Sequence, residues 1–185
     1  MNTQFNRIVD PIDYAVSLPE VQDYLKIDYN TDDTEIQYLI EAAINDAETY
    51  MRRALLTATY QAVSDDMHEC FPLRFGPIQE ITSIKYINLD GDTRTIAPES
   101  YYLTRKNLNG MIVFVDDFEL PTDVRKFEGW IVEYIAGYGK PDEVPSIIRN
   151  ALKICIATAY EFREESVGIP EEAKRIYDKY KIRTL

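Results

Sequence analysis

The spacing of apolar residues changes twice along this chain, and these changes limit the folds it can adopt. Up to about residue 54, apolar side chains recur every three or four residues, as in amphipathic helices. From about residue 57 to 137 the spacing is two, as in half-buried strands, and after residue 145 the helical spacing returns. The sequence therefore predicts an α+β fold. Two N-terminal helices and a long C-terminal helix form a core, with a β-rich insertion at 57–137.

Both predicted N-terminal helices open with a cap-plus-three pair, in which the first side chain can accept a bond from a free backbone N–H of the helix start. The pairs are Ser17 with Glu20 and Asp32 with Glu35. They predict helices over residues 17–27 and 33–54. Residues 1–15 precede these signals and are predicted to form a polar N-terminal arm.

The inserted region contains a clear turn signal. Asp90 and Gly91 separate two runs of alternating residues, which is typical of a tight β-hairpin. The stretch 116–129 carries several charges and Pro121, and is predicted to be an exposed loop.

Two prolines mark the starts of the last helices. Pro145 precedes helical spacing that continues to about residue 166, and Pro170 precedes a short final helix. Ile176, Tyr177 and Tyr180 fall on one face of this last helix, with basic residues around them. Two interpretations of residues 168–185 stay open: an amphipathic helix packed on its own core, or a segment that docks into a partner through aromatic anchors.

Composition excludes several functional classes. The 185 residues carry a formal net charge of −12, so the chain has no general attraction for a phosphate backbone. Two cysteines cannot form a disulfide framework and are predicted to be free thiols. The sequence predicts no membrane span and no signal peptide. Its 14 tyrosines are many for this length and indicate interfaces, because tyrosine tolerates both water and burial.

The sequence offers no catalytic constellation. His68 is the single histidine, and its neighbours match no closed zinc pattern. Phosphate-loop and dinucleotide motifs are absent, and so is the elbow that carries a nucleophilic serine. We therefore predict that the protein is not an enzyme and needs no metal or cofactor.

Several segments, taken in order, resemble the head–tail connector family of tailed phages. Residues 16–28 are similar to its opening helix, and 36–43 and 48–55 to the start and end of its next helix. Residues 73–86 are similar to its strand block, and 136–145 with 160–164 to its closing block. Arg52 stands where glycine is frequent in the family.

The resemblance implies a structural virion protein, a single connector domain spanning 1–185. Such a protein forms a homo-oligomeric ring, expected to be twelve-fold, beneath the portal protein. The ring extends the DNA channel and joins head to tail through a stopper or tail-completion protein. DNA passes without sequence-specific binding, and assembly takes place in the host cytoplasm.

The resemblance also implies that the C-terminal docking segment, 168–185, reaches the portal. The residues expected to bind it are Ile176, Tyr177, Tyr180 and Arg183. Two other functions stay open: another junction component, such as a stopper or tail-completion protein, and an acidic DNA-mimic inhibitor.

Overall fold

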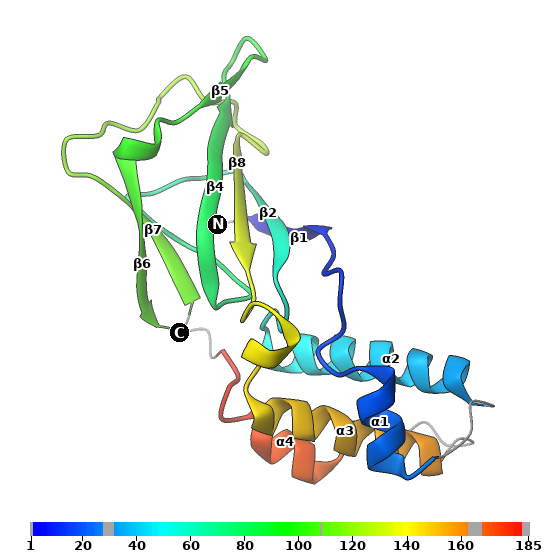
Figure 1. Ribbon diagram of the computed structural model, residues 1–185. Coiled ribbons are helices and arrows are strands. Elements are labelled where there is room, and N and C mark those ends of the chain that lie inside the picture. The colour runs from blue at the N-terminus through cyan, green and yellow to red at the C-terminus, as the bar shows by residue number, and fades with distance from the viewer. Residues whose placement is uncertain (1, 28–31, 108, 163–167, 183–185) are drawn as a thin grey trace. The chain divides into compact units, whose positions relative to one another are not determined.

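The computed structural model describes residues 2–27, 32–107, 109–162 and 168–182 (Figure 1). The chain divides into two compact units. The β unit comprises residues 1–10 and 57–137, and the helical unit comprises 11–56 and 138–185. Helices and antiparallel sheets thus occupy separate parts of the chain, and the predicted α+β class is confirmed.

Four helices build the helical unit: α1 (Leu18–Leu25), α2 (Asp33–Met51), α3 (Ser146–Glu161) and α4 (Glu171–Tyr177). A 3₁₀ turn, Pro141–Glu143, precedes α3. Helix α3 packs against both α2 and α4 (Figure 1). Two small residues of α2, Ala43 and Ala47, are buried in the common core and let the neighbouring helix approach closely.

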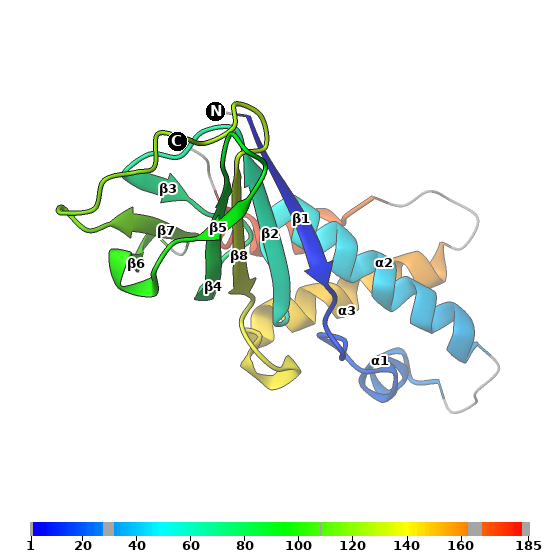
Figure 2. The ribbon, with the colours of Figure 1, turned by 90° about the horizontal axis from the view of Figure 1, so that it is seen from above.

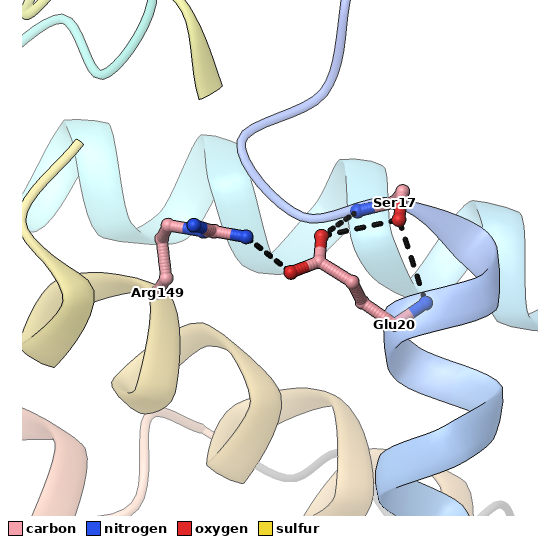
Figure 3. Close-up of polar contacts among 3 residues, drawn as sticks. All are labelled: Ser17, Glu20 and Arg149. Atoms are coloured by element: carbon pink, nitrogen blue, oxygen red, sulfur yellow. Dashed lines mark hydrogen bonds and ion pairs between the residues drawn. The ribbon is translucent and has the colours of Figure 1, made fainter. Parts of the chain in front are cut away.

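The predicted capping box at α1 is confirmed. Ser17 Oγ accepts a bond from the backbone N–H of Glu20, and the Glu20 carboxylate accepts one from the backbone N–H of Ser17 at 3.0 Å. Figure 3 shows that the same carboxylate also binds the guanidinium of Arg149 on α3. One side chain thus caps α1 and ties it to α3. The cap spacing predicts the first role, whereas the ion pair joins residues 129 positions apart.

The second predicted cap differs from the structure. Asp32 precedes α2, but its carboxylate makes no capping bond to the helix backbone. Asp32 Oδ2 instead accepts a bond from the hydroxyl of Tyr160 on α3, at 2.5 Å. The Asp32 carboxylate thus binds the Tyr160 hydroxyl and not a backbone N–H of the first turn of α2. This bond ties the start of α2 to the end of α3.

The helix ends fall earlier than predicted, at residues that adopt left-handed backbone geometry. Helix α1 is followed by Lys26, with φ 56°, and α2 by Arg52, also with φ 56°. Left-handed geometry ends an α-helix and favours glycine, which has no Cβ to clash. Residues 52–54, predicted as helix, therefore lie beyond it.

Two antiparallel sheets form the β unit. The first has the order β1 (Thr3–Val9), β2 (Ala58–Ser64), β8 (Trp130–Ala136), β4 (Ile78–Ile87) and β5 (Thr93–Thr95). The second has the order β3 (Cys70–Pro72), β7 (Asn109–Phe114) and β6 (Tyr101–Asn107), and its strands lie together in Figure 2. A short 3₁₀ turn, Pro98–Ser100, precedes β6.

Residues 3–9, expected to belong to a polar arm, form the edge strand β1. Thr3 pairs with Ser64 and Arg7 with Tyr60 on β2. Phe5 is the one large apolar residue in the first half of the strand, and the guanidinium of Arg74 lies 4.9 Å from its ring centre. Only Thr3 and Phe5 of this edge strand are half-buried and the rest is exposed, so the strand gives almost no periodic signal in the sequence.

Aromatic packing fills the centre of the β unit. Strands β2 and β8 alternate fully buried and half-buried residues along their whole length, as the period of two predicts. The ring of Tyr60 stacks on Phe75 and on Tyr134, at 4.9 and 5.7 Å between ring centres. The Tyr134 hydroxyl donates to the carbonyl of Arg74 at 3.1 Å, so this buried polar atom is satisfied.

The predicted hairpin at 90–91 is confirmed. Strands β4 and β5 pair on either side of it, and Gly91 adopts φ 91°. The side chain of Asn88 closes the turn by accepting a bond from the backbone N–H of Asp92 at 2.7 Å.

The left-handed residue at the end of α1 gives a stability prediction. Lys26→Gly should raise the free energy of unfolding by about 0.5–1 kcal/mol, because an exposed lysine with positive φ is strained and glycine is not. Urea denaturation followed by circular dichroism measures the change. Gly91→Ala is the reverse control and should lower stability. Equal or lower stability of Lys26→Gly would contradict the backbone argument.

Candidate partner-binding surface

The C-terminal segment is the part of the chain that the sequence singles out for partner binding. Pro170 immediately precedes α4, where its missing N–H costs no helical bond. Ala173 and Tyr177 are four residues apart and point to the same side of the helix, where both are completely buried. This side of α4 therefore belongs to the core of the helical unit.

Tyr177 is held inside the helical unit by contacts from two other helices. Its ring centre lies 6.3 Å from that of Tyr50 on α2, and its hydroxyl oxygen lies 3.7 Å from Cys155 Sγ on α3. Burial raises the pKa of the Tyr177 hydroxyl well above its usual value, and burial also raises the pKa of the Cys155 thiol. In this structure Tyr177 is a core residue, not an exposed anchor.

Ile176 and Tyr180, the next two expected docking residues, are half-buried. Both pack against the core cluster of the helical unit, and each keeps part of its side chain accessible. Arg183, the fourth, lies outside the described residues. The structure thus brings Ile176, Tyr177 and Tyr180 together on one segment, but gives them different exposures.

Beyond α4, the chain is fastened to the C-terminal end of α2. The backbone N–H of Ile182 donates to the carbonyl of Met51 at 2.9 Å. The guanidinium of Arg53 donates to the carbonyl of Tyr180. Arg53 is 1% exposed, and burial lowers the pKa of its guanidinium. The apolar run 54–56 that directly follows Arg53 is the signal in the sequence for its burial.

Polar side chains strengthen this attachment. The hydroxyl of Tyr50 donates to Asp178 Oδ1 at 2.8 Å, and this bond raises the pKa of Tyr50. The ammonium of Lys181 lies 4.0 Å from the centre of the Tyr50 ring. Lys174 pairs with Glu171 at 2.7 Å. Two basic residues of the segment, Arg175 and Lys179, are exposed to solvent.

Across residues 2–27, 32–107, 109–162 and 168–182, no group of three or more histidine, cysteine or carboxylate side chains is placed to hold a metal ion. His68 and Cys70 are both exposed. Among those same residues, no helix is both long and apolar enough to cross a membrane.

The buried position of Tyr177 gives a prediction that separates core packing from docking. Tyr177→Ala should lower the free energy of unfolding by about 3–5 kcal/mol, since it empties a large buried site. Tyr177→Phe keeps the ring and should cost only about 1 kcal/mol. Tyr38→Ala, at a tyrosine that is 66% exposed, is the matched control and should change stability little. A Tyr177→Ala variant as stable as this control would contradict the core assignment.

The fold has counterparts among solved structures. No protein-family profile and no curated protein matches this chain. Among solved structures, it is similar to a chain in the neck of an empty gene transfer agent (GTA) particle computed with C6 symmetry. The TM-score is 0.83 and the sequence identity 18%, over 98% of this chain and 97% of that chain.

Two further structures agree. One is the virion of the native GTA particle, with a TM-score of 0.81 and 18% identity. The other is the neck of the native particle computed with C12 symmetry, with a TM-score of 0.80 and 19% identity. Both likenesses cover 98% of this chain and 97% of the other. At these identities, they establish that the chain shares the whole fold of these particle chains.

Proposed function

We propose that this protein is a structural head–tail connector, an adaptor that forms a ring beneath a portal and extends the DNA channel towards the tail. The observation that carries the proposal is the full-length likeness to chains of a GTA neck and virion. A likeness that covers both units is more specific than one confined to a common β-sandwich or helical bundle. In this role the protein is a component of the virion and performs no catalysis.

Symmetry supports the ring. The related necks were computed with C6 and C12 symmetry, in which copies of a chain repeat around one axis. Subunits of a closed ring meet head to tail, so each needs two different contact surfaces. A ring of twelve copies around a channel fits the proposed position at the portal.

The net charge of −12 suits a conduit for DNA. Phosphates bind proteins chiefly through lysine and arginine, and a channel wall with an excess of carboxylates repels them instead. DNA can therefore move through such a ring without being held, and no sequence-specific contact is needed.

The C-terminal segment is the proposed portal contact. Its described part is anchored to α2, because Arg53 binds the carbonyl of Tyr180 and Met51 binds the N–H of Ile182. Tyr177, which is buried in the core, stabilises this anchored segment. The accessible parts of Ile176 and Tyr180, together with Arg183, are the proposed contacts with the portal.

Electron microscopy tests the ring directly. The purified protein, mixed with its portal, should form a ring coaxial with the portal and on the side away from the capsid interior. Particles produced without this protein should contain packaged heads that lack tails. Binding to the tail alone, with no ring on the portal, would contradict the adaptor role and favour a tail-completion protein.

Removal of residues 183–185 tests the portal contact without disturbing the core. This variant keeps residues 168–182, which make the contacts of the C-terminal segment described above, and it is expected to unfold at the same temperature as the full chain. Its affinity for the portal should fall at least about tenfold, since few residues carry most interface energy. Lys26→Ala, an exposed change in the same unit, is the control. Unchanged portal affinity would exclude Arg183 from the proposed contact.

A further inference from the structure

Strand β1 ends one side of the five-stranded sheet, and among the described strands it pairs with β2 alone. The backbone N–H of Asp65 donates to the carbonyl of Asn2, so the even-numbered residues at the start of β1 turn their backbone groups towards β2. In the alternation of an antiparallel pair, Thr3 and Phe5 turn their backbone groups outward. Outward N–H and C=O groups along an edge strand are a template for pairing with another strand.

The composition of β1 gives this edge little protection against pairing. The strand is seven residues long, contains no proline or lysine, and has one irregularity, a register shift between Arg7 and Val9. Ile8 and Val9, at its C-terminal end, are 47% and 55% exposed. Two other edge strands, β3 and β5, have three residues each, and β3 ends in Pro72. A long edge with exposed apolar side chains pairs with a second chain unless a strand covers it.

A hollow lies beside the N-terminal half of β1. Its lining residues come from the start of the chain, from β2 and its end, and from the turn before β8: Asn2, Gln4, Val63, Asp65, Phe127 and Glu128. Phe127 is 67% exposed, and the turn that carries it is firmly fastened. The N–H of Glu128 donates to Asp65 Oδ1 at 2.8 Å, and the Arg125 guanidinium donates to the Glu128 carbonyl at 3.0 Å. An exposed ring on a fixed turn is preorganised for contact.

Carboxylates outnumber bases around this hollow. The acids are Asp65, Asp66 and Glu128. The bases are Arg125, whose guanidinium lies 3.7 Å from the Glu128 carboxylate, and Lys126, whose ammonium lies 5.5 Å from the centre of the Phe127 ring. The edge of β1 is therefore acidic at its N-terminal end and apolar at its C-terminal end.

Strand β6 is the one other edge strand of this length in the described part of the chain. It has seven residues and pairs with β7 alone. The N–H of Val115 donates to the carbonyl of Ser100, so the same alternation turns the backbone groups of Tyr101 and Leu103 outward. The second sheet thus also ends in a strand that can accept another.

The order of residues along β6 is complementary to the edge of β1. Strand β6 begins with two tyrosines and a leucine, and its second half carries two bases and no acid. Tyr102 is exposed, and the exposed Arg105 donates to the carbonyls of Ile78 and Gln79, which are neutral groups. The edge of β6 is therefore aromatic at its N-terminal end and cationic at its C-terminal end.

We propose that the edge of β1 pairs with the edge of β6 of a second copy of this chain, in antiparallel orientation. This orientation brings the tyrosines of β6 to the exposed Ile8 and Val9, and its bases to the acidic hollow. Parallel pairing would instead bring the bases to the apolar end. The inference rests on the proposed ring, because head-to-tail contact uses two different surfaces of each subunit. Around a closed ring, every β1 edge is covered by a β6 edge.

Two substitutions at one residue test the backbone pairing. Phe5→Pro removes an outward N–H and leaves the bonds to β2 in place, whereas Phe5→Ala removes the same ring and keeps that N–H. Ring formation with the portal is followed by analytical ultracentrifugation and electron microscopy, and folding by circular dichroism. Phe5→Pro should stay folded and lose at least about nine-tenths of the rings formed by Phe5→Ala, because a proline on the edge prevents strand addition.

Cysteine cross-linking tests the two edges without blocking either of them. In a Cys70→Ser background, Asn6→Cys and Tyr102→Cys place thiols at exposed positions of β1 and β6. A short bis-maleimide added to assembled rings should join successive copies into a ladder of multimers on a denaturing gel. Asn6→Cys combined with Leu89→Cys, at an exposed position of the β4–β5 hairpin, is the matched control and should give no ladder.

The outcomes separate this inference from the proposed function. Rings that give no ladder, or rings as abundant from Phe5→Pro as from Phe5→Ala, overturn the inference and leave the adaptor role intact. Abundant Phe5→Pro rings that no longer bind the tail assign the β1 edge to a tail-side protein, which also overturns it. If Phe5→Pro does not fold, the ladder decides alone. An unchanged chain that forms no ring with the portal overturns the proposed function itself.

Discussion

The helical unit depends on how one buried cation is satisfied. Arg53 is almost fully removed from water, and an unpartnered guanidinium in that position would cost several kcal/mol. It donates to the carbonyl of Tyr180, and the Tyr138 hydroxyl opposes the effect of burial on its pKa. Both partners come from residues 138–185, the stretch of the helical unit that follows the β region. Burial of Arg53 therefore requires that the C-terminal segment return to the end of α2, which in turn places Tyr177 in the core.

The sequence predicted those features that depend on local chemistry. Periodicity located the helical and strand regions, the pair Ser17–Glu20 located the start of α1, and Asp90–Gly91 located a hairpin. It did not predict features that depend on a distant partner. Asp32 has the type and spacing of a cap, yet Tyr160 competes for its carboxylate from 128 residues away. The same limit applies to the candidate site, since the amphipathic pattern of 173–180 fits a core helix and a docking helix equally well. Burial of Tyr177 distinguishes them, and burial is a property of the whole unit.

Arg52 stands at a position where the motif that this sequence resembles usually has glycine. The backbone geometry at this position explains why glycine suits it. The connector-like motif favours glycine at this position, and the structure gives Arg52 a φ of 56°, where glycine is unstrained. The backbone therefore makes a left-handed turn here at a residue other than glycine. The turn is required because α2 must stop at Met51 for its last carbonyl groups to meet Ile182. The end of α2 and the attachment of the C-terminal segment are thus two consequences of one backbone geometry.

Net charge and surface patterning together explain how such a subunit could both assemble and avoid DNA. Copies that each carry −12 repel one another, so their association needs contact surfaces from which charge has been removed or at which it is paired. Carboxylates elsewhere remain free to face solvent or a channel. In the proposed ring, contacts between copies must therefore be neutral or charge-paired, whereas the channel wall must present few cations, because cations exposed in the channel would retain the DNA that has to pass.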